Sequence, residues 1–128
     1  MRTRDSLSIL TVEEQVRVDG QRLHDIVDEL GESAAQNVIG LALEHLAQAL
    51  TDAHAAGQGG DMALLAAQAD RLSRLAWQVG LVTLEGVAVD VGDCAGRGDR
   101  TALAATLARL MRVGNHSLTL IWDDTPVS

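Results

Sequence analysis

The sequence lacks phenylalanine, tyrosine and lysine, and it contains a single proline and a single cysteine. Without phenylalanine or tyrosine, a hydrophobic core must be built from Leu, Val, Ile and Ala, which suits closely packed helices. Because Pro126 is the only proline, no residue before the C-terminal tail prevents a helix through a fixed φ and a missing N–H. Cys94 alone forms neither an internal disulfide nor a metal site, which is consistent with a reducing cytosol.

Positive charge is also scarce, because ten arginines stand against eighteen acidic residues and give a formal net charge of −8. This balance opposes a phosphate backbone, so we expect no nucleic-acid partner. The sequence has no run of 18 apolar residues that could span a bilayer, and its first residues lack the apolar segment of a secretory signal. We therefore expect a cytoplasmic protein without a membrane partner.

Hydrophobic residues recur at spacings of three and four along most of the chain, and this period predicts helices. The length of 128 residues is enough for about one domain. We expect an N-terminal extension at residues 1–20, with a short helix that Thr11 caps and that reaches the Asp19-Gly20 break. The bundle itself should occupy residues 21–122, followed by a polar tail at 123–128.

Within the bundle, the helix-ending Gly31 and the N-caps Asp61 and Asp99 help to divide the chain into a short helix and four longer ones. These should occupy residues 21–30, 32–55, 62–79, 83–95 and 100–122. The fold we expect is all-α, an antiparallel up-down-up-down four-helix bundle with the short extra N-terminal helix across one end or side. In the long second helix, the predicted core stripe is Ala35, Val38, Ile39, Ala42, Leu46, Ala49, Leu50 and Ala53. The valine-rich residues 86–91 leave a strand open as a minor alternative.

The most informative stretch is residues 69–80, which read Ala-Asp-Arg-Leu-Ser-Arg-Leu-Ala-Trp-Gln-Val-Gly. It resembles, without a gap, the signature helix of histidine-containing phosphotransfer (HPt) domains, roughly Ala-His-x-Leu-Lys-Gly-x-Ala-x-x-Leu-Gly. The small and apolar positions and the closing glycine of the pattern are present as Ala69, Leu72, Ala76, Val79 and Gly80. The order of turns is also similar to the family over about residues 21–122, including the Arg97-Gly98-Asp99 step before the last helix.

The resemblance implies a protein of a two-component phosphorelay, whose partners are a response-regulator receiver domain or a histidine kinase. Asp70 occupies the position of the phospho-accepting histidine, Ser73 that of the lysine and Arg74 that of the following glycine. A carboxylate is a poor nucleophile for this transfer, so we interpret the chain as a non-phosphorylatable pseudo-HPt protein, with no catalytic residue. At about 100° per residue, Asp70 lies roughly 140° from the core stripe and should point to water.

The predicted partner-docking face is the exposed side of this helix, formed by Asp70, Arg71, Ser73, Arg74 and Trp77. A solvated helix face explains the charged residues equally simply, and Trp77 could instead fold over the edge of the bundle. Two further alternatives are an active phosphorelay transferase that uses another histidine (His24, His45, His54 or His116) and a helical dimerisation module with Trp77 or Trp122 in a homodimer interface. No metal-ligand spacing stands out, and we expect no cofactor.

Overall fold

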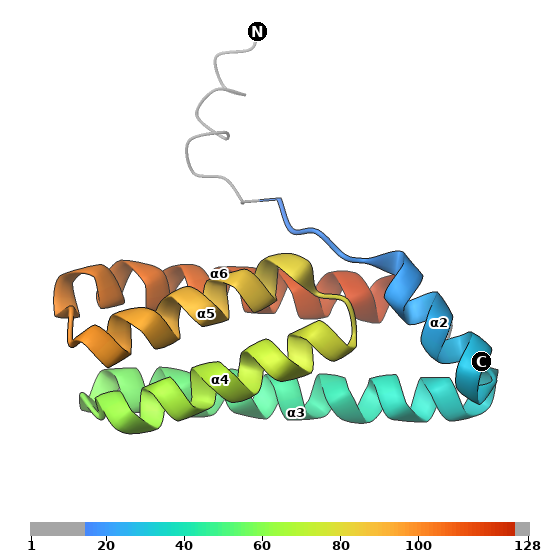
Figure 1. Ribbon diagram of the computed structural model, residues 1–128, viewed down its shortest axis with the longest axis horizontal. Coiled ribbons are helices and arrows are strands. Elements are labelled where there is room, and N and C mark those ends of the chain that lie inside the picture. The colour runs from blue at the N-terminus through green and yellow to red at the C-terminus, as the bar shows by residue number, and fades with distance from the viewer. Residues whose placement is uncertain (1–14, 125–128) are drawn as a thin grey trace, which may run out of the picture.

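The computed structural model describes residues 15–124, with side chains to Ile121. These residues form five helices: α2 (Gly20–Leu30), α3 (Glu32–Gly59), α4 (Met62–Gln78), α5 (Val82–Arg97) and α6 (Arg100–Asp124). In Figure 1, α3, α4, α5 and α6 run along the length of the molecule, and α2 lies at one end. The expected all-α bundle with a short extra N-terminal helix is confirmed.

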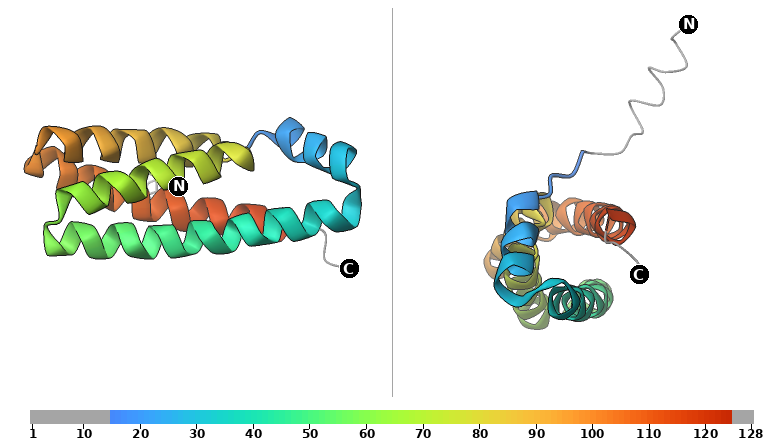
Figure 2. Two further views of the ribbon diagram at one scale, coloured as in Figure 1. Left: turned by 60° about the horizontal axis from the view of Figure 1, so that its bottom comes forward. Right: turned by 90° about the vertical axis from the view of Figure 1, so that its right-hand side faces the viewer.

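The end-on view in Figure 2 shows how the short helix is placed. α2 crosses the end of the bundle, from the turn between α4 and α5 to the start of α3. The side chain of Asp19 caps α2 by accepting hydrogen bonds from the backbone N–H groups of Gln21 and Arg22. Gly31 ends the helix with a φ of 85°, as its position in the sequence predicted.

The expected short helix before α2 is wrong for residues 15–19, which are not helical. Val18 instead makes an isolated antiparallel bridge to Leu81. The N–H of Val82 donates to the carbonyl of Arg17 at 3.1 Å, and the N–H of Arg17 donates to Thr83 Oγ1 at 2.8 Å. These hydrogen bonds to the start of α5 pair the backbone groups of residues 15–19 in an extended conformation. The contacts with α5 therefore outweigh the helix propensity of this segment. Thr11 lies outside the described residues.

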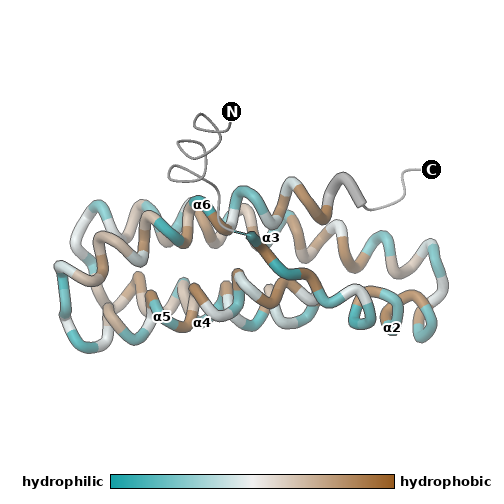
Figure 3. The backbone as a smooth tube through the Cα atoms, turned by 90° about the horizontal axis from the view of Figure 1, so that it is seen from above, coloured by the Kyte–Doolittle hydropathy of each residue, from teal (hydrophilic) through white to brown (hydrophobic). Residues whose placement is uncertain are grey.

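The core consists of aliphatic side chains along one face of each long helix, and Figure 3 shows the resulting alternation of hydrophobic and hydrophilic positions. The prediction of Val38 as a core residue is wrong, because this side chain is 46% exposed. Leu43, which the prediction omitted, is buried. The buried stripe follows Ile39, Leu43, Leu46 and Leu50 at spacings of four, three and four, and Val38 lies one residue off that line.

The turn between α3 and α4 is shorter than the glycine-rich sequence suggests. α3 continues past the predicted end at residue 55 and stops at Gly60, whose φ is 73°. Gly57 lies within α3, and a Cβ atom there would meet a methyl group of Leu107 of α6, so this glycine leaves room for a neighbouring helix and does not form the turn. Asp61 then caps α4 as predicted, accepting from the N–H of Leu64 at 3.0 Å.

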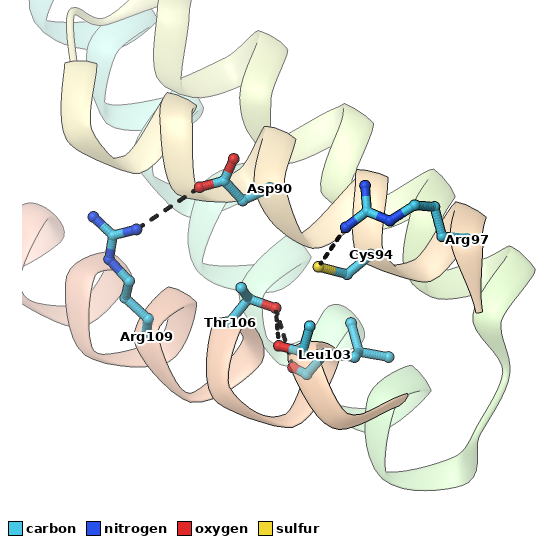
Figure 4. Close-up of polar contacts among 7 residues, drawn as sticks. Asp90, Cys94, Arg97, Leu103, Thr106 and Arg109 are labelled. Atoms are coloured by element: carbon cyan, nitrogen blue, oxygen red, sulfur yellow. Dashed lines mark hydrogen bonds and ion pairs between the residues drawn. The ribbon is translucent and has the colours of Figure 1, made fainter. Parts of the chain in front are cut away.

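An ion pair joins α5 to α6, and Figure 4 shows it beside polar contacts within each of the two helices. Arg109 of α6 lies 3.7 Å from the carboxylate of Asp90 on α5.

Residues 86–91 are helical, so the strand alternative is wrong for this segment. Val87 and Val91 are both buried, at the helical spacing of four, and this burial outweighs the strand preference of valine.

Candidate functional site

The outer face of α4 is built from side chains at helical spacing, opposite the buried face of the same helix. Leu65, Ala69, Leu72 and Ala76 are buried in the core. Asp70 and Arg74 point outward, and their side chains are 63% and 74% exposed. The predicted orientation of Asp70 toward water is therefore confirmed.

The charges at the centre of this face are paired within α4. Arg74 Nη2 lies 2.7 Å from a carboxylate oxygen of Asp70, one helical turn earlier. Ser73 donates its hydroxyl to the backbone carbonyl of Asp70 at 2.9 Å. The centre of this face contains neither a lysine amine nor an imidazole, because the sequence has no lysine and none of its histidines lies on α4.

Arg71 lies toward the neighbouring helix α3. Its guanidinium is 4.0 Å from the carboxylate of Asp52, and both side chains are about 40% exposed. This contact extends the α4 face onto α3. Asp52 was absent from the sequence-based prediction, because helical period places residues within one helix and carries no information about which residues of two helices meet.

Trp77 is 51% exposed and is also covered on one side by α2. The guanidinium carbon of Arg22 lies 3.7 Å from the centre of the Trp77 ring, a cation–π contact. The expectation that Trp77 is exposed and the alternative that it folds over the edge of the bundle are thus both partly correct, because the ring is half-exposed and contacts Arg22 of α2. Arg22 joins the face, and again no sequence signal within one helix could have identified it.

The closing glycine of residues 69–80 has a physical role at the end of α4. Gly80 has a φ of 76°, and a Cβ atom there would lie 2.6 Å from the carbonyl oxygen of Asp19. The N–H of Asp19 donates to the carbonyl of Gly80 at 2.6 Å. Only glycine combines this backbone conformation with such a close approach, so Gly80 holds α2 against the end of α4 beside Trp77.

The five predicted residues therefore share one side of α4, within about 10 Å along its axis. We call Asp70, Arg71, Ser73, Arg74 and Trp77, together with Arg22 and Asp52, the docking face. The structure brings none of the four histidines onto α4: His24 lies on α2, His45 and His54 lie on α3, and His116 lies on α6. All four are exposed, and His24 lies 3.7 Å from Asp28.

Two kinds of site have no support in the described part of the chain. Residues 15–124 contain no group of three or more His, Cys, Asp or Glu side chains placed to hold a metal ion. None of the helices described there is both long and apolar enough to cross a bilayer.

No protein-family model and no curated protein sequence matches the chain. Among solved structures, the chain is similar to histidine-containing phosphotransfer protein B (HptB) from Pseudomonas aeruginosa PAO1, with a TM-score of 0.77. The two sequences are 20% identical, and the match covers 84% of this chain and 93% of HptB. The chain has the HPt fold. Fold and motif thus agree, since the helix that resembles the HPt signature is a central helix of an HPt-like bundle.

Proposed function

We propose that the chain is a pseudo-HPt protein, which binds receiver or histidine kinase domains of a cytoplasmic phosphorelay without carrying phosphate itself. The observation that supports this most directly is the position of Asp70. It stands where the HPt pattern has the phospho-accepting histidine, on an exposed face of a bundle with the HPt fold. Binding of such a partner requires only an exposed surface of this kind, whereas phosphate transfer requires the chemical groups of the pattern, which are replaced in this sequence.

Two of the replacements change how a partner could approach. Arg74, at the position of the pattern's glycine, adds a long side chain that is 74% exposed and tied to Asp70. Ser73, at the position of the lysine, turns its hydroxyl back to its own helix. Transfer chemistry would lack both the nucleophile and the neutralising cation, whereas binding requires only a complementary surface.

Trp77 is the residue of the docking face from which we expect the largest contribution to binding. A half-exposed tryptophan that a partner can cover buries a large apolar area, and tryptophan is enriched among binding hot spots. Its contact with Arg22 holds the ring in place before binding, which lowers the entropic cost of ordering it.

The test is a titration of the full chain against isolated receiver and kinase domains from the same organism. At least one domain should bind, and Trp77→Ala should weaken that binding about tenfold or more. The matched control is Val89→Ala, which removes another half-exposed hydrophobic side chain on α5, outside the docking face. Failure of every domain to bind, or a Trp77→Ala variant that loses stability but binds normally, would contradict the proposal.

Phosphate uptake separates the pseudo-HPt proposal from an active transferase that uses another histidine. Incubation of the chain with a phosphorylated receiver should leave no acid-labile phosphate on it. The triple variant Asp70→His, Ser73→Lys, Arg74→Gly serves as the positive control, because it restores the three groups of the HPt pattern. Labelling of the unaltered chain would overturn the non-phosphorylatable assignment, and single His→Gln variants would then locate the acceptor.

A further inference from the structure

A second surface lies between α3 and α6, where a groove of about 500 Å³ opens to solvent. Leu103 and Leu107 of α6 lie on its floor and are nearly buried. Ala104 and Ala108 are exposed along the same stretch of α6, and their small side chains leave the groove shallow and accessible. The remaining lining residues are His54, Gly57, Gln58, Met62, Arg100, Met111 and Arg112.

The groove differs in charge from the rest of the molecule. No acidic residue lines it, although the chain as a whole has a net charge of −8. Arg100 and Arg112 stand about 18 Å apart along α6, which is about three helical turns. Neither has an ion-pair partner among the described side chains, whereas Arg109 on the other side of α6 pairs with Asp90. Two uncompensated positive charges thus flank an apolar floor.

We propose that this groove binds an acidic amphipathic helix of a partner protein. The apolar floor fits a row of hydrophobic side chains at spacings of three and four, as in other helix-in-groove complexes. Met62 and Met111 are flexible enough to adjust to such side chains. Acidic residues near the two ends of a helix of about three turns would lie beside Arg100 and Arg112. This proposal does not depend on the proposed function, because it uses no residue of the docking face.

The charges also argue against a second copy of this chain as the occupant. In a two-fold dimer centred on the groove, Arg100 and Arg112 of one copy would lie close to the same two arginines of the other copy. Like charges at close range are unfavourable. An acidic helix has the opposite charge and supplies the ion-pair partners that Arg100 and Arg112 lack among the described side chains. We therefore treat self-association as an outcome that the experiment must detect.

The experiment selects binders from a displayed library of 16-residue peptides against the full chain. Each peptide carries leucine at positions i, i+3, i+4 and i+7, with Glu, Lys or Gln varied at the remaining positions. Acidic peptides should be enriched, and the double variant Arg100→Glu, Arg112→Glu should weaken their binding at least tenfold and favour Lys-rich peptides instead. The matched control is Arg74→Glu on the docking face, which should leave peptide binding unchanged.

A second variant tests the place of binding without changing charge. Ala108→Trp should fill the groove from an exposed position and abolish binding of the selected peptides, while circular dichroism shows the fold unchanged. Enrichment of no peptide, of neutral peptides or of basic peptides would overturn the proposal. So would sedimentation of the chain as a dimer that Ala108→Trp dissociates, because the groove would then be a self-interface.

Discussion

The docking face on α4 and the groove between α3 and α6 both carry arginine, but they differ in what surrounds each guanidinium. On the docking face, Arg74 lies against Asp70, Arg71 against Asp52 and Arg22 against the ring of Trp77. In the groove, Arg100 and Arg112 have no such partner among the described side chains. A partner of the docking face must therefore replace existing contacts of these arginines. We expect the affinity there to depend mainly on shape and on Trp77, whereas the affinity of the groove should depend mainly on charge.

The two surfaces also lie over different parts of the core. Substitutions of the core leucines beneath them should give the largest change in the free energy of unfolding. Leu72 lies beneath the docking face and is completely buried, whereas Leu107 borders the open groove with 9% exposure. Leu72→Ala should lower the free energy of unfolding by about 2–5 kcal/mol, because it leaves an enclosed cavity. Leu107→Ala should cost about half as much, since water and Met side chains can enter the space from the groove.

Denaturant unfolding of both variants measures this difference, with the midpoint and the slope compared to the unaltered chain. An unchanged slope ensures that the comparison concerns the folded state. If Leu107→Ala costs as much as Leu72→Ala, the groove floor is as closed as the core, and the distinction between the two surfaces fails.

Two glycines test how tightly α3 and α6 pack along their contact, which we call the α3–α6 seam. A Cβ atom at Gly114 of α6 would lie 2.7 Å from both terminal methyl groups of Leu50 and 3.2 Å from its Cγ. Because Leu50 is only 3% exposed, rotation of its side chain does not relieve this crowding. Gly114→Ala should therefore destabilise the fold by about 1–3 kcal/mol, despite the better helix propensity of alanine.

Gly57→Ala is the matched variant on the opposite helix. A Cβ atom there meets a single methyl group of Leu107, while the Leu107 Cγ stays 3.6 Å away. Leu107 can rotate toward the groove, so the gain of up to about 1 kcal/mol in helix propensity should offset the contact. Thermal unfolding of both variants should show a lowered melting temperature for Gly114→Ala alone. Equal losses would mean that the groove end of the seam is as tightly packed as the closed end.

The sequence was sufficient to predict the helices because their signals are local. Core stripes, N-caps such as Asp61 and Asp99, and the closing glycines all lie within a few residues of the structure that they specify. The predictions were wrong where contacts with a segment distant in the sequence determine the local structure. Residues 15–19 are extended because they bond to the start of α5, and Gly57, beyond the predicted end of its helix at residue 55, lies within α3 against Leu107 of α6.

The candidate site divides in the same way. Helical period was enough to place Asp70, Ser73, Arg74 and Trp77 on one side of α4. It could not supply Arg22 or Asp52, whose contacts with that side depend on how α2 and α3 pack against α4. The groove was missed for the same reason, since its residues belong to helices separated by about 40 positions and their unpaired charges become apparent only once the two helices are placed together.

The smallest expected effect concerns the ion pair at the centre of the docking face. In a double-mutant cycle, Asp70→Ala and Arg74→Ala should show a coupling of about 0.2–0.5 kcal/mol in unfolding free energy, because both side chains are largely exposed. The coupling should fall further in about 1 M salt, where screening acts within roughly 3 Å. A coupling above about 1 kcal/mol would mean that the pair is part of the fold's stability, and Arg74 would then be held too firmly for a partner to displace it from Asp70.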